Sequence, residues 1–160
     1  MRVVTLLALW LHLLGVVVWL GGVLYQAHIL MPMAHRASGP MGHRTGAAMF
    51  ANAARRQRPF GWTALALVVL TGFYNVTQLG PAEKVMESGA GLLLAGKFIL
   101  VLIVIAVSGQ RDFTQLVRLE IALKTSEDPT PSLRAIAWLD RLTILLAVII
   151  MYLGLAASRS

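Results

Sequence analysis

The chain has no cysteine, and only 13% of its 160 residues carry a charge. The missing cysteines exclude disulfides, thiolate zinc sites, iron–sulfur clusters and thioether-attached haem. The low charge excludes a disordered chain. The 58% of hydrophobic residues, with a mean hydropathy of +0.73, excludes a water-soluble enzyme, because a domain this small cannot bury so much apolar surface. Membrane lipid is therefore expected to surround much of the chain and is one of its expected partners.

The sequence also lacks the motifs of several soluble functions. No base-stacking aromatic motif accompanies the arginines, so the net charge of +7 indicates attraction to an anionic membrane leaflet rather than to nucleic acid. Walker and dinucleotide-binding fingerprints are missing, and no nucleophile–histidine–acid set can be assembled. Asp140 and Arg141 are expected to form a charged pair at the membrane interface, where the last span begins.

Four apolar stretches are long enough to cross about 30 Å of hydrocarbon as helices, which takes roughly 20 residues each. They cover about residues 3–30, 60–79, 90–108 and 135–157. None has the period-2 alternation of a membrane β-strand. The sequence therefore predicts an all-α fold, a four-helix transmembrane bundle, formed by a single integral-membrane domain over residues 1–160.

The connections between the spans differ in composition. Residues 31–58 are rich in His, Met, Gly and Arg, and Pro59 is expected in the first turn of the second span. Residues 111–128 predict a helical extension of the third span, with its apolar face in the headgroup zone. Pro129 and Pro131 are expected to end that extension.

Basic residues favour one side of the membrane. Ten of them lie in the two long connections, against three on the opposite side. Since cytoplasmic loops are enriched in Lys and Arg, both long connections are predicted to be cytoplasmic and both termini outside. A bacterial inner membrane is the expected location.

Two ionisable residues lie inside the predicted spans, where charge is costly and usually functional. His12 and Lys97 lie about 13 Å and 10 Å from the outer side, at 1.5 Å per residue, in spans that run in the same direction. Imidazole is a good iron ligand, and burial disfavours the charged form of an amine. The two side chains could therefore hold a haem iron between them; in the alternative, Lys97 snorkels to the interface.

Small and aromatic residues share a helix face with His12. Such a face indicates either tight helix packing or a cavity for a ligand. Asn75 and Tyr152 are expected at comparable depth in other spans, as supporting partners or as simple interhelical hydrogen bonds. The residues of the face, at spacings of three and four, are His12, Gly15, Trp19, Gly22 and Gln26.

A second group of candidate ligands lies in the first connection. Thioether and imidazole groups are soft ligands that suit copper(I), although methionine there can equally be apolar filler. His28 and His35 are also candidates for a second, inner haem. The candidate copper ligands are Met31, Met33, His35, Met41 and His43.

Four segments resemble a known superfamily; in one of them, Arg134 with Trp138, Leu139 and Asp140 resembles the start of the HemJ-type last helix. Leu11-His12, Trp19, Gly22 and Tyr25 resemble the first-helix pattern H-x6-W-x2-G-x2-Y of CopD-like copper resistance membrane domains and HemJ-type protoporphyrinogen oxidases. The segment Thr71-Gly72-Phe73-Tyr74-Asn75 resembles the CopD-type end of a second helix, and Gly96-Lys97-Phe98-Ile99-Leu100-Val101 resembles the third-helix K-x3-V segment.

This resemblance implies a haem b whose ligands are His12 and Lys97. It also implies oxidation of protoporphyrinogen IX, with electrons passed onward in the membrane. Ser108-Gly109-Gln110 replaces the HemJ-type Tyr-His pair, and Asp140-Arg141-Leu142-Thr143 replaces its Asn-Glu-x-Pro, so the electron-transfer function is preferred to the oxidase.

The sequence thus predicts a haem b-binding membrane protein of the CopD/HemJ superfamily that transfers electrons. Gly15, Trp19 and Gly22 would shape its cavity, with Asn75 and Tyr152 in support. One alternative is an enzyme, a HemJ-type protoporphyrinogen IX dehydrogenase. The other is copper transport or resistance through the Met/His-rich connection. The expected partners are a redox protein or a quinone, with assembly as a homo-oligomer or a subunit of a larger complex.

Overall fold

The computed structural model describes residues 2–36, 39–78 and 89–157, and within these ranges it contains helices and no strand. The predicted all-α class is confirmed. The elements, in chain order, are α1 (Arg2–Tyr25), the π-helical turn η1 (Gln26–Leu30), α2 (Met31–Arg36), α3 (Gly39–Thr77), α5 (Gly89–Gly109), the π-helical turn η2 (Gln110–Gln115), α6 (Leu116–Thr125) and α7 (Thr130–Ala157).

Within the described residues, four helices are long and apolar enough to cross a membrane. They cover Val3–Arg36, Met41–Thr77, Gly91–Thr125 and Thr130–Ala156. Because η1 and η2 continue the helices on either side of them, α1 runs on into α2, and α5 runs on into α6. The described chain is therefore a four-helix transmembrane bundle.

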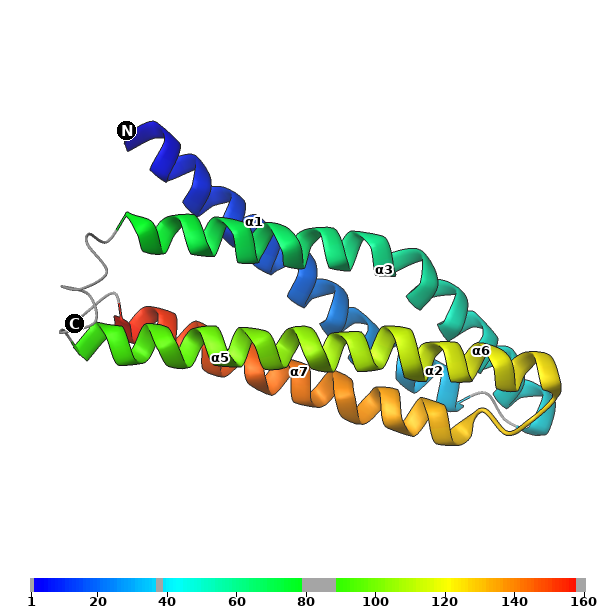
Figure 1. Ribbon diagram of the computed structural model, residues 1–160. Coiled ribbons are helices and arrows are strands. Elements are labelled where there is room, and N and C mark those ends of the chain that lie inside the picture. The colour runs from blue at the N-terminus through cyan, green and yellow to red at the C-terminus, as the bar shows by residue number, and fades with distance from the viewer. Residues whose placement is uncertain (1, 37–38, 79–88, 158–160) are drawn as a thin grey trace.

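The helices alternate in direction, so that α1 begins and α7 ends at the same end of the bundle (Figure 1). α1 packs mainly on α3, and α5 packs mainly on α7. The two pairs meet where α6 contacts α3 and where α1 and η1 contact α7. α1 and α5 therefore run parallel, as the sequence predicts.

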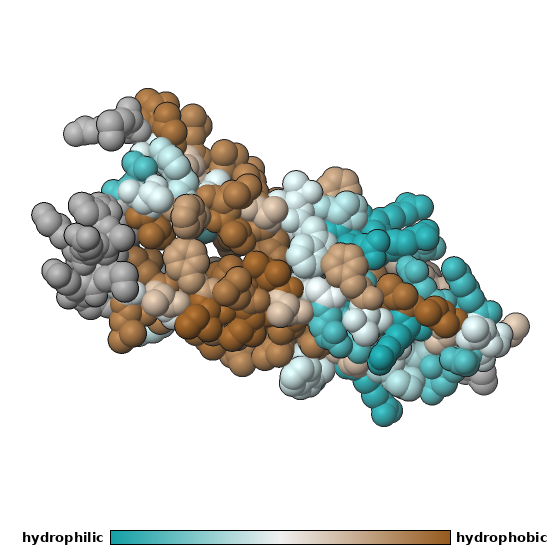
Figure 2. Space-filling view, in the orientation of Figure 1, coloured by the Kyte–Doolittle hydropathy of each residue, from teal (hydrophilic) through white to brown (hydrophobic). Residues whose placement is uncertain are grey.

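The two ends of the bundle differ in character. Figure 2 shows an apolar half at the end where α1 begins and a hydrophilic half at the α6 end. The hydrophilic half has its own hydrophobic core, in which Ala47 and Phe50 of α3 pack with Leu119 of α6 and Ile136 of α7. The helices thus continue as a packed bundle beyond the apolar half.

The described residues of the connection over residues 31–58 are helical and belong to α2 and the N-terminal half of α3. The prediction that Pro59 lies in the first turn of a helix is wrong, since α3 begins at Gly39 and continues through it. Pro59 is exposed, and α3 is bent in its N-terminal half (Figure 1), as expected of a helix that contains proline. Pro59 removes one backbone hydrogen bond from α3. The packing of the alanine-rich N-terminal half of α3 outweighs this loss.

The apolar face of α6 also differs from its predicted place. Leu116, Leu119 and Ala122 are buried inside the protein, whereas the sequence predicts this face in the headgroup zone. The reason is that α3 and α7 both reach α6, so protein covers the face that lipid would otherwise cover.

α6 and α7 are joined by a tight turn with its own polar contacts. Ser126 ends α6 in the left-handed conformation, with φ 61°. Asp128 then accepts hydrogen bonds at Oδ1 from the hydroxyl (2.6 Å) and the backbone N–H (3.0 Å) of Thr130. These bonds lower the pKa of Asp128. The stabilisation they give the start of α7 is therefore present at neutral pH and lost as the pH falls through the lowered value.

The orientation predicted from the basic residues can be tested by single-cysteine labelling, since the chain has no cysteine of its own. Gln78 and Glu127 are exposed at opposite ends of the bundle. In sealed right-side-out vesicles, a membrane-impermeant maleimide is expected to label Gln78→Cys at once and Glu127→Cys only after permeabilisation. The reverse pattern would show that the long connections lie outside.

Candidate functional site

An apolar cavity of about 460 Å³ lies between the two helix pairs, in the apolar half of the bundle. Its walls come from α1, α3, α5 and α7 and consist mostly of Leu, Val, Ile and Phe side chains. His12 of α1 and Lys97 of α5 both line it. The structure therefore brings the two ionisable span residues to one cavity, which is large enough for a small-molecule or cofactor site.

The His12 ring is oriented by α3. Its Nδ1 lies 3.0 Å from the carbonyl oxygen of Val68 and 3.1 Å from Oγ1 of Thr71. Because the Thr71 hydroxyl donates to the carbonyl of Leu67 at 2.6 Å, both partners of Nδ1 act as acceptors. Nδ1 therefore carries the ring proton, and Nε2 of the neutral ring keeps its lone pair. This is how proteins orient a metal-binding histidine.

Two glycines make room for the nitrogen-bearing side chains. A Cβ at position 72 would lie 3.1 Å from Cε1 of His12, and a Cβ at position 154 would lie 3.2 Å from Nζ of Lys97. The imidazole of His12 thus packs against α3, and the amine of Lys97 packs against α7. A side chain added at Gly72 or Gly154 would make a tight contact, so the imidazole or the amine would have to shift by a few tenths of an ångström.

Some of the other residues on the His12 face line the cavity, and others pack against a neighbouring helix. Trp19 is buried and lines the cavity. Gly15 instead packs against α3, where an added Cβ would lie 2.8 Å from Val68, and Gly22 packs directly against Gln57. The face therefore serves helix packing at its glycines and the cavity at His12 and Trp19.

Asn75 and Tyr152 do not line the cavity. Oδ1 of Asn75 is buried without a hydrogen-bond partner in the described chain. Tyr152 is 70% exposed, because α7 turns that face away from the other helices. Neither side chain therefore supports His12 or Lys97 directly.

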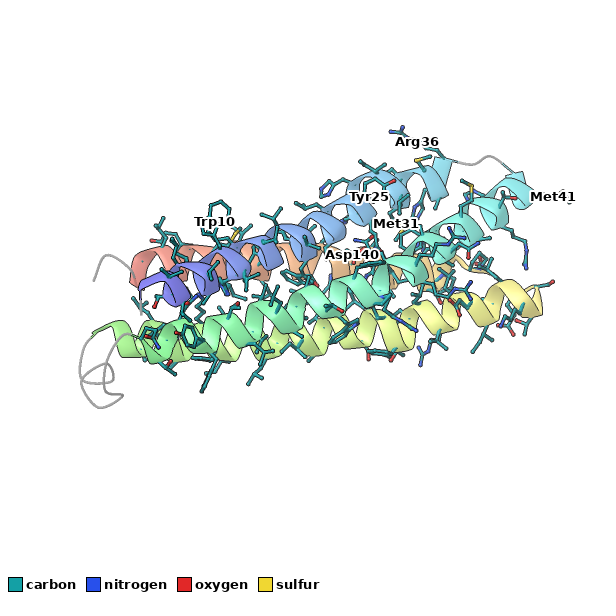
Figure 3. The ribbon with its side chains drawn as sticks, turned by 90° about the horizontal axis from the view of Figure 1, so that it is seen from above. Trp10, Tyr25, Met31, Arg36, Met41 and Asp140 are labelled. Carbon is teal, nitrogen blue, oxygen red and sulfur yellow. The ribbon has the colours of Figure 1, made fainter. Side chains whose placement is uncertain are left out.

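The candidate copper ligands of the first connection lie in different surroundings. Met31 is buried in the hydrophobic core, whereas Met33, His35, Met41 and His43 are exposed. Figure 3 shows Met41 far along the bundle from Met31. The described residues contain no cluster of three or more His, Cys, Asp or Glu side chains that could hold a metal ion.

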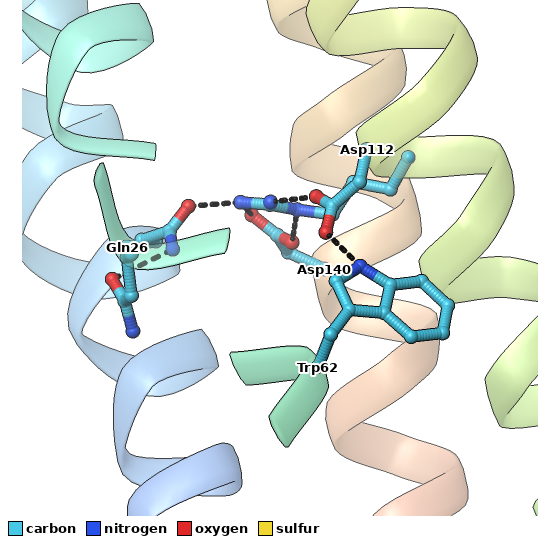
Figure 4. A network of polar contacts seen from close by, with 6 residues as sticks. Gln26, Trp62, Asp112 and Asp140 are labelled. Carbon is cyan, nitrogen blue, oxygen red and sulfur yellow. Dashed lines mark hydrogen bonds and ion pairs between the residues drawn. The ribbon is translucent and has the colours of Figure 1, made fainter. Parts of the chain in front are cut away.

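A buried polar cluster lies beyond the inner end of the cavity (Figure 4). Nε of Arg111 donates to Oδ1 of Asp140 at 2.6 Å, and its NH1 group donates to Oδ1 of Asp112 at 2.6 Å. Its NH2 group donates to the side-chain oxygen of Gln26. The predicted interfacial pair of Asp140 with Arg141 is therefore wrong: Asp140 is fully buried and paired with Arg111, and Arg141 is exposed.

Two further side chains from α3 complete this cluster. Nε1 of Trp62 donates to Oδ2 of Asp112 at 2.9 Å, and Nε2 of Gln26 donates to Oε1 of Gln57 at 2.7 Å. Gln26, Arg111 and Asp112 all lie in the π-helical turns η1 and η2, which occur frequently at functional sites. This cluster was not predicted from the sequence, although opposite charges stand close to the ends of the third and fourth spans.

Fold and cavity together define an integral membrane protein with an internal apolar cavity. The family model of copper resistance protein D (CopD) matches residues 51–158, and the chain belongs to this family. The family points to a copper resistance membrane protein. No curated protein and no solved structure shows significant similarity to the chain. The matched segment includes Lys97 and Arg111, whereas His12 precedes it.

The polar cluster leads to a prediction about stability. Replacing Arg111 by Gln leaves two buried carboxylates without their counter-ion, which is expected to lower the free energy of unfolding by about 3–5 kcal/mol. Arg118→Gln, at an exposed position further along the same helical segment, is the matched control. Unfolding of the two variants in mixed detergent micelles measures the difference. Equal stability would mean that Arg111 is not needed to hold the cluster together.

Proposed function

We propose that the cavity binds a b-type haem between His12 and Lys97, and that the protein transfers electrons within the membrane. The observation that carries this proposal is the orientation of His12, whose Nδ1–H is held by α3 while Nε2 keeps its lone pair beside the cavity. Lys97 adds a second nitrogen from the parallel helix α5.

The donor set and the walls fit a haem better than a bare ion. A protein-bound metal ion usually takes four or more ligands, and the described lining offers two nitrogens and the sulfur of Met151. A haem brings four equatorial nitrogens of its own and needs only axial ligands and an apolar pocket. His12 and Lys97 would be the ligands, and the apolar lining would be the pocket.

Each group of the chain then has a defined task. The carbonyl of Val68 and the hydroxyl of Thr71 hold the His12 ring in one orientation, and the packed side chains around Trp19 restrict access of water. Bound haem supplies one-electron redox chemistry. A quinone or a membrane-bound redox protein would provide and receive the electron. Dehydrogenation of protoporphyrinogen IX, as in HemJ-type enzymes, would use the same cavity.

Copper handling is the second candidate, because the family is that of copper resistance protein D. His12 and Met151 line the same cavity from α1 and α7, and imidazole and thioether ligands suit copper(I). In this case copper is the substrate, and it would use the cavity rather than the dispersed Met/His set of the first connection.

Spectroscopy of the purified protein tests the haem proposal. Addition of haem b is expected to give a Soret band that His12→Ala and Lys97→Ala abolish or shift. Thr71→Val removes a hydrogen-bond partner of the ligand and is expected to weaken haem binding about 10–100-fold. His28→Ala and Lys124→Ala, both at exposed positions, should leave the band unchanged.

A protein that stays colourless after haem addition would contradict the proposal. Anaerobic titration with copper(I) separates the second candidate. Binding that weakens in both His12→Ala and Met151→Leu would favour copper as the substrate of the cavity. Copper binding that depends on Met33 and His43 instead would show that copper binds to the first connection and not in the cavity.

A further inference from the structure

A small chamber of about 40 Å³ lies beside the Arg111 cluster, on the side of the cavity that faces the hydrophilic half. One ordered water needs at least about 10–15 Å³ measured in this way, so the chamber has room for one to three waters. Its polar lining comes from every helical segment around it. The residues with polar side-chain groups are Gln26, Gln57, Arg58, Ser108, Arg111, Asp112, Asp140 and Thr143, with the indoles of Trp19 and Trp62.

Two basic and two acidic side chains line the chamber, and three of the four are buried. They belong to Arg58, Arg111, Asp112 and Asp140. Arg58 is only half-buried, and its guanidinium lies over the ring of Phe113, 5.4 Å from the centroid. Arg111 therefore faces two buried carboxylates alone. A buried excess of one negative charge is costly, and one proton would remove it.

The two carboxylates differ in how well they are satisfied. Asp112 accepts a short hydrogen bond at each oxygen, one from Arg111 and one from Trp62. Asp140 accepts a 2.6 Å bond at Oδ1, but its Oδ2 has only a 3.5 Å contact with Arg111. Oδ2 of Asp140 is therefore the carboxylate oxygen best placed to take a proton.

A neighbouring side chain indicates that the chamber holds a ligand. Thr143 lies one helical turn after Asp140, on the same face of α7. It is 2% exposed, lines the chamber, and its Oγ1 has no hydrogen-bond partner among the described residues. A buried hydroxyl without a partner is rare in proteins, and water is the usual explanation.

We propose that Asp140 is a proton-binding site, reached through water in the chamber that hydrogen-bonds to Thr143. The proton adds to Oδ2 of the Asp140 carboxylate and comes from water of the hydrophilic half. Trp19 and Leu65 line both the chamber and the apolar cavity, so the proton site adjoins the ligand site. If the proposed electron transfer holds, one proton taken up by Asp140 offsets the charge of one electron that enters the cavity.

Infrared spectroscopy of the full chain in detergent tests the proton site without any haem. At a pH at which ordinary aspartates are ionised, the wild type is expected to show the C=O band of a protonated carboxylic acid, with a downshift in D2O. Asp140→Asn should lose the band, Asp112→Asn should keep it, and Thr143→Val should shift it. Absence of the band in the wild type, or its persistence in Asp140→Asn, would overturn the proposal.

Two features keep this test decisive. If Asp140→Asn does not fold, the C=O band of the wild type and its shift in Thr143→Val decide the outcome, because both proteins keep the Asp140 carboxylate. The link to electron transfer has a separate readout. In haem-loaded protein, the midpoint potential is expected to fall by up to about 59 mV for each tenfold drop in proton concentration, and this slope should vanish in Asp140→Asn. A slope that Asp140→Asn leaves unchanged would overturn the link.

Discussion

The ion pairs of Arg111 are the constraint on which the bundle depends. A guanidinium buried in an apolar protein is unfavourable unless its donors are all engaged. The chain meets this need with Asp112 on the same turn, Asp140 on α7 and Gln26 on η1. Three helical segments that are distant in sequence must therefore meet at one level, and Trp62 and Gln57 attach α3 to the same point. The geometry of the rest of the molecule follows from this meeting.

The cavity is a consequence of where that meeting lies. Below the cluster the helices converge on a second hydrophobic core in the hydrophilic half. Above it, α1 packs on α3, α5 packs on α7, and α1 also contacts α7. Trp19, Leu65, Val104 and Leu146 form a hydrophobic core there, to which all four long helices contribute. The cavity lies among these helices, with His12 and Lys97 on its walls.

The sequence could predict what depends on local pattern. Hydrophobic length gave the four spans, and depth along parallel helices placed His12 and Lys97 at one level. It could not predict the partner of Asp140, because Arg141 is adjacent in sequence whereas Arg111 is adjacent only in the fold. The same reason explains Pro59, where packing of distant residues decides the helix boundary. Whether a residue is buried depends on how the whole bundle packs, so burial cannot be predicted from one segment of the sequence.

The positions of the two sites relative to each other bear on how such a bundle can work. An electron entering an apolar cavity raises the energy of the interior, because the surrounding dielectric is low. A chain with so few charges has little means of offsetting that energy except at the cluster, which lies next to the cavity across Trp19 and Leu65. A copper ion in the cavity would carry the opposite charge, and the cluster would attract it when Asp140 is ionised. For either ligand, a change in the charge of Asp140 would change the electrostatic potential of the adjoining cavity, which is how the polar cluster would act on a bound ligand.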